Sequence, residues 1–310
     1  MKKNLKIFIH PGMSKTGTTY LQKLCFSKID EIHNIWKPDF MKNQKLIDIR
    51  HSILGSKNYK YDAVKVKQDS DSIIKKLEKT KKKILLSEEN LTLDSTKLKI
   101  TADRLKEIFP DAIILFTVRE QFNFLTSLYF SWLSIDRVRE KTPMSSLSEW
   151  LEFQISLRNS GLNNVIDRVC FHKTISYFEK LFGRKNVHVV FYEDFIMQPE
   201  LFFTQISNVF GIPRDKFLQN HRENFKNKPR ERISFYKAKI LQSKLYPVIS
   251  KVWKKLPKLI KNIFHSNLNK KANEKIDYKI QKELETEFFE ANYYLSKKLK
   301  RDLSQIGYKY

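Results

Sequence analysis

The sequence predicts an α/β fold, in which a parallel β-sheet is flanked by helices and a helical extension follows at the C-terminal end. Three observations support this fold class. Short apolar runs of strand length alternate with longer helical patterns over the first two thirds of the chain. A turn rich in Gly, Ser and Thr follows the first apolar run, and beyond Ser234 long helical patterns contain a single glycine. A chain of 310 residues with 41% hydrophobic content can bury one sizeable core of this kind.

The elements follow one another in the order that such a sheet requires. The strands are predicted at residues 5–9, 83–87, 112–118 and 187–192. The helices are predicted at residues 18–26, 69–79, 101–109, 121–134, 147–157, 171–182 and 199–210. Pro110, Gly183 and Gly211 follow three of these helices and mark where they end. A last helix is predicted at residues 278–306, returning to the body of the protein.

The turn after the first strand reads GMSKTGTT and is built to hold a phosphate group. Gly12 and Gly17 let the backbone bend so that successive N–H groups point inward, and Lys15 adds a positive charge. The helix that follows presents its N-terminus, which favours anions. The loop residues predicted to bind this ligand are Gly12, Ser14, Lys15, Thr16, Gly17, Thr18 and Thr19.

The spacing within the loop separates two families. Nucleotide triphosphatases read G-x-x-x-x-G-K-[ST], whereas here Thr18 follows Gly17 and the lysine lies inside the loop. Lys-Thr-Gly-Thr-Thr followed by an aromatic residue closely resembles the phosphosulfate-binding loop of sulfotransferases that use 3′-phosphoadenosine-5′-phosphosulfate (PAPS). The resemblance implies a P-loop-like sheet, PAPS as the sulfuryl donor, and no requirement for a metal.

A donor with a 3′-phosphate needs a second anion site, and the chain offers one. Residues 112–118 form a continuous apolar run that ends at Arg119, and Ser127 lies about two helical turns further on. An arginine fork and a serine hydroxyl together supply three donors to a phosphate. This pair resembles the 3′-phosphate motif of the same family. The alternative for Arg119 is a surface ion pair with Glu120 or Asp136, and the alternative for Ser127 is a solvated position on the helix.

The transfer needs a base for the acceptor hydroxyl. The strand at residues 83–87 leads into Glu88 and Glu89, which would lie at the same sheet edge as the loop. Glu89 is the first choice, by its resemblance to the Ser-Glu-Asn stretch of bacterial sulfotransferases, and Glu88 and His10 are the alternatives. Lys15 would stabilise the oxygen that bridges phosphate and sulfur.

A basic stretch, residues 219–232, follows the last core helix and is predicted to be a loop. It resembles the loop that closes over the adenosine bisphosphate in sulfotransferases, although the glycine-rich form is absent, and Arg222 and Arg230 are its candidate ligands. Residues 181–212 resemble the C-terminal half of the sulfotransferase core. Their carboxylates, Glu193 and Asp194, are expected to cap a turn or to pair with basic residues.

The chain carries 59 Lys and Arg against 34 Asp and Glu, a formal net charge of +25. Such an excess of positive charge favours anionic partners: acidic substrates, an anionic membrane surface or nucleic acid. No nucleic-acid module accompanies the lysines, so we expect no nucleic-acid partner. A basic amphipathic pattern at residues 252–264 could contact an anionic membrane or pack on the core. With no signal peptide or span recognisable, we expect a cytoplasmic protein, and peripheral contact with the inner membrane surface stays open as an alternative. Cys25 and Cys170 are expected to be reduced.

The sequence therefore predicts a sulfotransferase core at residues 1–233 and a helical extension at residues 234–310 packed on it. By family analogy, PAPS would donate a sulfuryl group to an acceptor hydroxyl, most plausibly of a carbohydrate or glycan precursor, with release of adenosine 3′,5′-bisphosphate. Two alternatives stay open: a nucleotide-dependent kinase that uses ATP and Mg²⁺, and a noncatalytic protein that binds polyanions. The sequence does not specify the acceptor or the oligomeric state.

Overall fold

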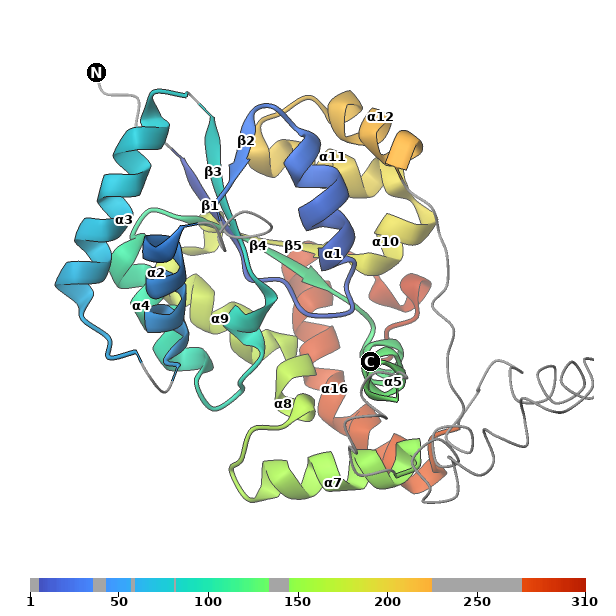
Figure 1. Ribbon diagram of the computed structural model, residues 1–310. Coiled ribbons are helices and arrows are strands. Elements are labelled where there is room, and N and C mark those ends of the chain that lie inside the picture. The colour runs from blue at the N-terminus through green and yellow to red at the C-terminus, as the bar shows by residue number, and fades with distance from the viewer. Residues whose placement is uncertain (1–5, 36–42, 57–58, 81, 134–144, 225–274) are drawn as a thin grey trace, which may run out of the picture.

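A computed structural model describes residues 6–35, 43–56, 59–80, 82–133, 145–224 and 275–310 (Figure 1). In these residues five parallel strands form one sheet in the order β2-β3-β1-β4-β5. The strands are β1 (Ile7–His10), β2 (Ile32–Asn34), β3 (Lys83–Ser87), β4 (Ile113–Val118) and β5 (Val187–Phe191). The predicted α/β class is thus confirmed, and β3 coincides with its predicted range. The structure adds β2, whose three residues are too short to leave an apolar pattern.

Helices cover both faces of the sheet. They are α1 (Thr18–Tyr20), α2 (Gln44–Leu54), α3 (Ala63–Glu78), α4 (Leu98–Ile108), α5 (Gln121–Trp132), α7 (Leu147–Asn159), α8 (Val165–Val169), α9 (Phe171–Phe182), α10 (Tyr192–Met197), α11 (Pro199–Phe210), α12 (Arg214–Asn224) and α16 (Tyr278–Leu299). The predicted ranges of α9 and α11 coincide with the observed ones. We did not predict α2, α8, α10 or α12. The helix predicted at residues 278–306 ends as α16 at Leu299 and is followed by a separate 3-10 turn, Leu303–Ile306.

Two predicted segments differ in form from the structure. The predicted helix at residues 18–26 is one α-helical turn that continues as a π-helical segment, Leu21–Cys25. The predicted loop at residues 219–232 was wrong at its start, because α12 extends to Asn224, with Phe217 and Leu218 buried in the core. The rest of that stretch, including Arg230, lies outside the described residues, as does the amphipathic pattern at residues 252–264.

Alternating side chains of the strands point to two separate apolar clusters. Phe8, Leu85 and Leu115 pack with the helical turns that follow β1 and with α11 and α12. Ile9, Leu86 and their neighbours on that side pack with α2, α3, α4, α5, α9 and α16. In Figure 1 α2, α3 and α4 lie to the left of the sheet, and α11 and α12 lie to the right. The strands β1, β3, β4 and β5 are buried on both faces, as parallel strands are, whereas the short edge strand β2 buries only Ile32.

His10 joins the three central strands at their carboxyl ends. It is fully buried, and its ring nitrogens lie 2.7 Å from the hydroxyl oxygens of Ser87 on β3 and Thr117 on β4. Burial lowers the pKa of His10 from 6.5 to about 4, so the ring is neutral at pH 7. A neutral imidazole can donate to one hydroxyl and accept from the other, and it therefore satisfies both partners without a buried charge.

The C-terminal segment completes the core on one side of the sheet. Ile280, Leu284 and Phe288 of α16 are buried in the same cluster as the strands. Beyond α16, Arg301 donates two hydrogen bonds, of 2.5 and 2.7 Å, to the fully buried carboxylate of Asp194. The predicted boundary between residues 233 and 234 lies outside the described residues. Within the described ranges, no helix has the length and apolar content needed to cross a bilayer.

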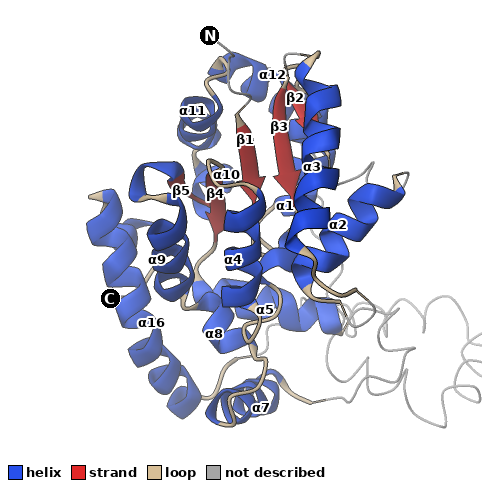
Figure 2. Ribbon diagram, turned by 90° about the vertical axis from the view of Figure 1, so that its left-hand side faces the viewer, coloured by secondary structure: helices blue, strands red, loops and turns tan. Residues whose placement is uncertain are grey.

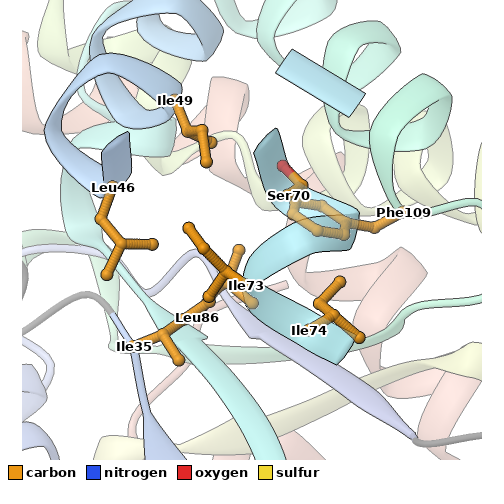
Figure 3. Close-up of a pocket in the computed structure, with 8 residues that line it drawn as sticks. All are labelled: Ile35, Leu46, Ile49, Ser70, Ile73, Ile74, Leu86 and Phe109. Atoms are coloured by element: carbon orange, nitrogen blue, oxygen red, sulfur yellow. The ribbon is translucent and has the colours of Figure 1, made fainter. Parts of the chain in front are cut away.

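A small apolar cavity lies between α2, α3 and β3 (Figure 3). Its lining residues are Ile35, Leu46, Ile49, Ser70, Ile73, Ile74, Leu86 and Phe109. Ser70 is the one polar side chain among them, and its sealed hydroxyl has no hydrogen-bond partner. A buried hydroxyl without a partner destabilises the fold.

We expect Ser70→Ala to increase the free energy of unfolding by about 1 kcal/mol, because the change removes an unsatisfied buried hydroxyl. Ser72→Ala is the matched control, because Ser72 lies on the same helix and reports only the small gain in helix propensity. Urea unfolding of both variants measures the difference. Equal effects at the two positions would show that the Ser70 hydroxyl carries no penalty.

The lowered pKa of His10 predicts a pH-dependent stability. Because the unfolded chain binds a proton near pH 6.5 and the folded chain only near pH 4, the stabilisation is complete above pH 6.5 and is lost as the pH falls toward 4. Relative to His10→Gln, the wild type should lose about 3 kcal/mol between pH 7 and pH 4. Denaturant titrations at several pH values test this, and parallel curves for the two proteins would contradict it.

Candidate functional site

The loop between β1 and α1 lies at the carboxyl edge of the sheet. Three of its residues adopt positive φ angles: Gly12 (31°), Lys15 (67°) and Gly17 (81°). A Cβ atom on Gly12 would lie 2.7 Å from the Thr18 side chain, so this position requires glycine. Lys15 adopts the left-handed conformation without being glycine, which costs about 1 to 2 kcal/mol. Such strained backbone is concentrated at functional sites.

Hydrogen bonds from threonines hold the loop in this shape. The Thr16 hydroxyl donates to the carbonyl of Met13 at 2.5 Å, and the Thr92 hydroxyl donates to the carbonyl of Gly12 at 3.1 Å. Thr16 and Thr18 are buried, so their side chains brace the loop from within. Ser14, Lys15 and Gly17 are partly exposed and Thr19 is exposed. The backbone N–H groups near Gly17 and the start of the helix give this loop the features of an anion site.

Arg119 approaches the loop from the end of β4. Its Nη1 donates to the carbonyl of Lys15 at 3.0 Å, and its guanidinium lies 4.5 Å from the centre of the Tyr192 ring. Its Nε is sealed from solvent and has no hydrogen-bond partner. The structure thus places the predicted arginine against the predicted loop. The predicted alternative of an ion pair with Glu120 does not occur, because Glu120 caps α5 through the N–H groups of Phe122 and Asn123. Asp136, the other partner considered, lies outside the described residues.

Helix α5 presents two serines to this region. The Lys15 ammonium donates to Ser131 Oγ at 2.7 Å. Ser127 lies four residues earlier, on the same face of the helix, and is partly exposed. We did not predict Ser131, although its spacing from Ser127 could have indicated it. Lys15 therefore links the loop to α5 through its side chain and to Arg119 through its carbonyl.

The two carboxylates after β3 have different environments. Glu88 is fully buried, accepts a hydrogen bond of 2.6 Å from Arg50 Nε, and caps the 3-10 turn Glu89–Thr92. Glu89 is partly exposed and accepts a hydrogen bond of 2.9 Å from the Thr18 hydroxyl. Only Glu89 lies against the loop with access to solvent. His10 is sealed beneath the loop, with both ring nitrogens engaged.

The structure adds one charged residue that the sequence did not indicate. Arg168 on α8 is only 9% exposed, and its Nη2 lies 3.3 Å from Ser14 Oγ in the loop. Burial lowers the pKa of Arg168 to about 10, and the nearby charges of Glu89 and Asp94 partly oppose that shift. The guanidinium stays charged at pH 7. No motif surrounds Arg168 in the sequence, and only the fold brings it to the loop.

Two carboxylates, Glu120 and Glu193, lie near enough to Arg119 for their charges to interact. Glu193 accepts hydrogen bonds from the backbone N–H of Glu120 at 3.0 Å and from the Tyr308 hydroxyl at 3.3 Å. Burial raises the pKa of Glu120 and of Glu193, whereas the positive charge of Arg119 acts in the opposite direction. Asp194 pairs with a basic residue, Arg301, as expected. Glu193 instead accepts from the Glu120 N–H and the Tyr308 hydroxyl, so its role is structural but differs in form from the prediction.

The remaining predicted ligands lie further out. Arg222, near the end of α12, is exposed, and its guanidinium lies 3.8 Å from Glu200. Helix α12 itself contacts the start of the site, because the Tyr20 hydroxyl lies 3.1 Å from His221 Nδ1. In the described part of the chain, no cluster of His, Cys, Asp and Glu could hold a metal ion. Both cysteines are buried free thiols.

A family model matches most of the chain. Residues 6–288 match the model of the sulfotransferase domain family. A sulfotransferase from Alicyclobacillus acidocaldarius has a similar structure, with a TM-score of 0.56, 15% sequence identity, and coverage of 97% of this chain and 98% of that chain. A sulfotransferase domain from the curacin biosynthetic pathway gives a TM-score of 0.42, at 12% identity, with 70% of this chain and 77% of that chain covered. Sulfotransferase STF9 from Mycobacterium avium gives a TM-score of 0.41, at 12% identity, with 81% of this chain and 77% of that chain covered.

A search of curated protein sequences found no match. The family model nevertheless covers nearly the whole chain, including the loop, Glu89 and Arg119. The structural likeness to the Alicyclobacillus protein extends over almost the full length of both chains. This protein belongs to the sulfotransferase family.

Proposed function

We propose that this protein transfers a sulfuryl group from PAPS to an acceptor hydroxyl and releases adenosine 3′,5′-bisphosphate. The observation that carries the proposal is the contact between the two predicted anion sites: Arg119 donates to the carbonyl of Lys15. The loop would hold the 5′-phosphosulfate, while Arg119 and Ser127 would hold the 3′-phosphate. One donor molecule with anionic groups at both ends would occupy both sites together.

The residues present fit such a donor. The sealed Nε of Arg119 has no partner among the described residues, and a phosphate oxygen would satisfy it. Ser127 on α5 offers a hydroxyl on the same side as Ser131, which already contacts Lys15. The donor supplies the activated sulfuryl group when it is bound. The cationic groups and N–H donors of the loop match its negative charge.

The roles of the chain's own groups follow from their positions. Glu89 would accept the proton of the acceptor hydroxyl, since it is the carboxylate against the loop that solvent can reach. The Lys15 ammonium would exchange its hydrogen bond to Ser131 for one to the oxygen that bridges phosphate and sulfur. There it would stabilise the negative charge that this oxygen acquires as the sulfuryl group is transferred. Thr18 would orient the Glu89 carboxylate through its hydroxyl. We assign no step to Glu88 or His10, because both are sealed and fully engaged.

The class of acceptor is a further part of the proposal. We propose a carbohydrate hydroxyl, by analogy with bacterial members of the family, and a net charge of +25 would favour a glycan that already bears acidic groups. The charge does not by itself require a nucleic-acid or membrane partner. A cytoplasmic location stays a prediction from the sequence.

Removal of the Arg119 guanidinium should weaken donor binding. We expect Arg119→Ala to lower the affinity for adenosine 3′,5′-bisphosphate by about 2 to 4 kcal/mol, because a charged hydrogen-bond donor to the 3′-phosphate is lost. Isothermal titration calorimetry measures this, with the exposed Arg184→Ala as control. Unchanged affinity would remove Arg119 from the donor site. ATP–Mg²⁺ binding far more tightly than the bisphosphate would favour a kinase instead.

The two neighbouring glutamates should respond differently to the same substitution. Glu89→Gln should lower the transfer rate by about 10²- to 10⁴-fold with little change in stability, because only the base is lost. Glu88→Gln should destabilise the fold by about 3 to 5 kcal/mol, because the buried charge of Arg50 loses its ion pair with Glu88. Rates with radiolabelled PAPS and thermal unfolding test both. Full activity of Glu89→Gln would identify another base.

A further inference from the structure

We propose that Arg168 binds an anionic group of the acceptor, so that this sulfotransferase acts on acidic glycans, those whose sugars carry a carboxylate or a sulfate. The inference rests on the proposed function, because it concerns the acceptor side of the same site. It starts from a charged side chain that is nine-tenths buried and touches the donor loop.

Arg168 lacks the carboxylate partner that a buried arginine normally has. Among the described residues no carboxylate oxygen lies within 4 Å of its guanidinium, and Ser14 Oγ is its one hydrogen-bond acceptor, at 3.3 Å. A guanidinium has five N–H donors, so most of them are left for a ligand. None of its nitrogens is both unpaired and sealed from solvent, so the nitrogens without a partner keep some exposure to solvent. An anion from outside the protein would offset the cost of burying the charge.

The backbone around Arg168 is fixed by hydrogen bonds from three sides. Ser95, in the turn after Glu89–Thr92, accepts from the backbone of Asn164 at 3.2 Å. Gln154 on α7 accepts from the Val165 N–H at 3.0 Å, and Asn164 caps the helix through the N–H of Asp167 at 2.8 Å. Figure 2 shows α8 beyond the carboxyl ends of the strands, near α5 and α7. The short helix α8 thus holds Arg168 in one place, as a binding residue requires.

The position of Arg168 favours the acceptor over the donor. Consecutive loop residues diverge, because the Lys15 side chain reaches α5 and the Ser14 side chain meets α8. The donor phosphates are assigned to the side of Lys15, Arg119 and Ser127. Arg168 and Glu89, the proposed base, meet the same loop, through Ser14 and Thr18, and the charge of Glu89 acts on Arg168. A cation that meets the loop on the side of the base would face the molecule whose hydroxyl is deprotonated, and that molecule is the acceptor.

The carboxylate or sulfate recognised by Arg168 would also orient the acceptor. An arginine can bind a carboxylate or sulfate through two parallel hydrogen bonds, which fix direction as well as distance. The nearby negative charges of Glu89 and Asp94 would repel an acidic glycan in the absence of Arg168. The positive charge of Arg168 would therefore offset this repulsion, so that an acidic acceptor could bind next to a carboxylate base.

The test compares acidic and neutral acceptors in wild type, Arg168→Gln and Arg168→Lys. The panel pairs p-nitrophenyl β-D-glucuronide with p-nitrophenyl β-D-glucoside, and unsulfated uronate-containing polysaccharides with dextran. We expect the wild type to sulfate the acidic members at least tenfold better, as kcat/KM. Arg168→Gln should lose at least tenfold on acidic acceptors with little change on neutral ones, and Arg168→Lys should recover part of the loss. The exposed Arg184→Gln is the matched control.

Donor measurements separate this inference from the proposed function. Calorimetry with adenosine 3′,5′-bisphosphate should give Arg168→Gln an affinity within about twofold of the wild type, which also shows that the variant is folded. A large loss of that affinity, an equal loss on acidic and neutral acceptors, or a wild type that sulfates no acidic member would each overturn the inference. If the wild type binds no bisphosphate and consumes no PAPS, the proposed function itself fails.

Discussion

The site depends on one strained residue, Lys15, whose left-handed backbone conformation directs its carbonyl and its side chain to two different elements. The carbonyl accepts from Arg119 after β4, and the ammonium donates to Ser131 on α5. Glycine would adopt this backbone without strain but would lack the charge, so the strain is the cost of placing an ammonium group at that point. The charge-assisted bond from Arg119 offsets part of it. The conformation of the loop and the position of Arg119 therefore depend on each other.

The sheet sets the distances between the parts of the site. Because β1 lies between β3 and β4, the segments that follow these three strands meet at one edge, where open α/β sheets bind their ligands. His10 strengthens this arrangement by contacting the last residue of β3 and a residue near the end of β4. Its buried neutral ring fixes the register of these three strands just beneath the loop. His10, which the sequence offered as an alternative base, thus has a structural role.

Sequence patterns predicted the parts of the protein that depend on local order. Continuous apolar runs gave β3 and β4, and the glycine spacing gave the loop, because strand burial and turn geometry leave signals within a few residues. The three-residue strand β2 and the one-turn helix α8 are too short to leave such a signal. Distinguishing Glu88 from Glu89 required Arg50, which lies 38 positions earlier, and Arg168 reaches a loop 154 positions away. Adjacent carboxylates look equal in a sequence until their distant partners are known.

The distribution of arginine partners separates structural charges from candidate ligand-binding ones. Arg50, Arg158 and Arg301 each meet a carboxylate at 3.1 Å or less, and each joins segments far from one another in the sequence. Arg119 and Arg168 differ in two ways: within the described residues neither has a carboxylate oxygen within 4 Å, and both contact the loop between β1 and α1. A protein that buries a guanidinium without an internal anion loses free energy unless a ligand supplies one. Since the two arginines contact adjacent loop residues, Lys15 and Ser14, the same physical argument assigns an anion to each side of the loop.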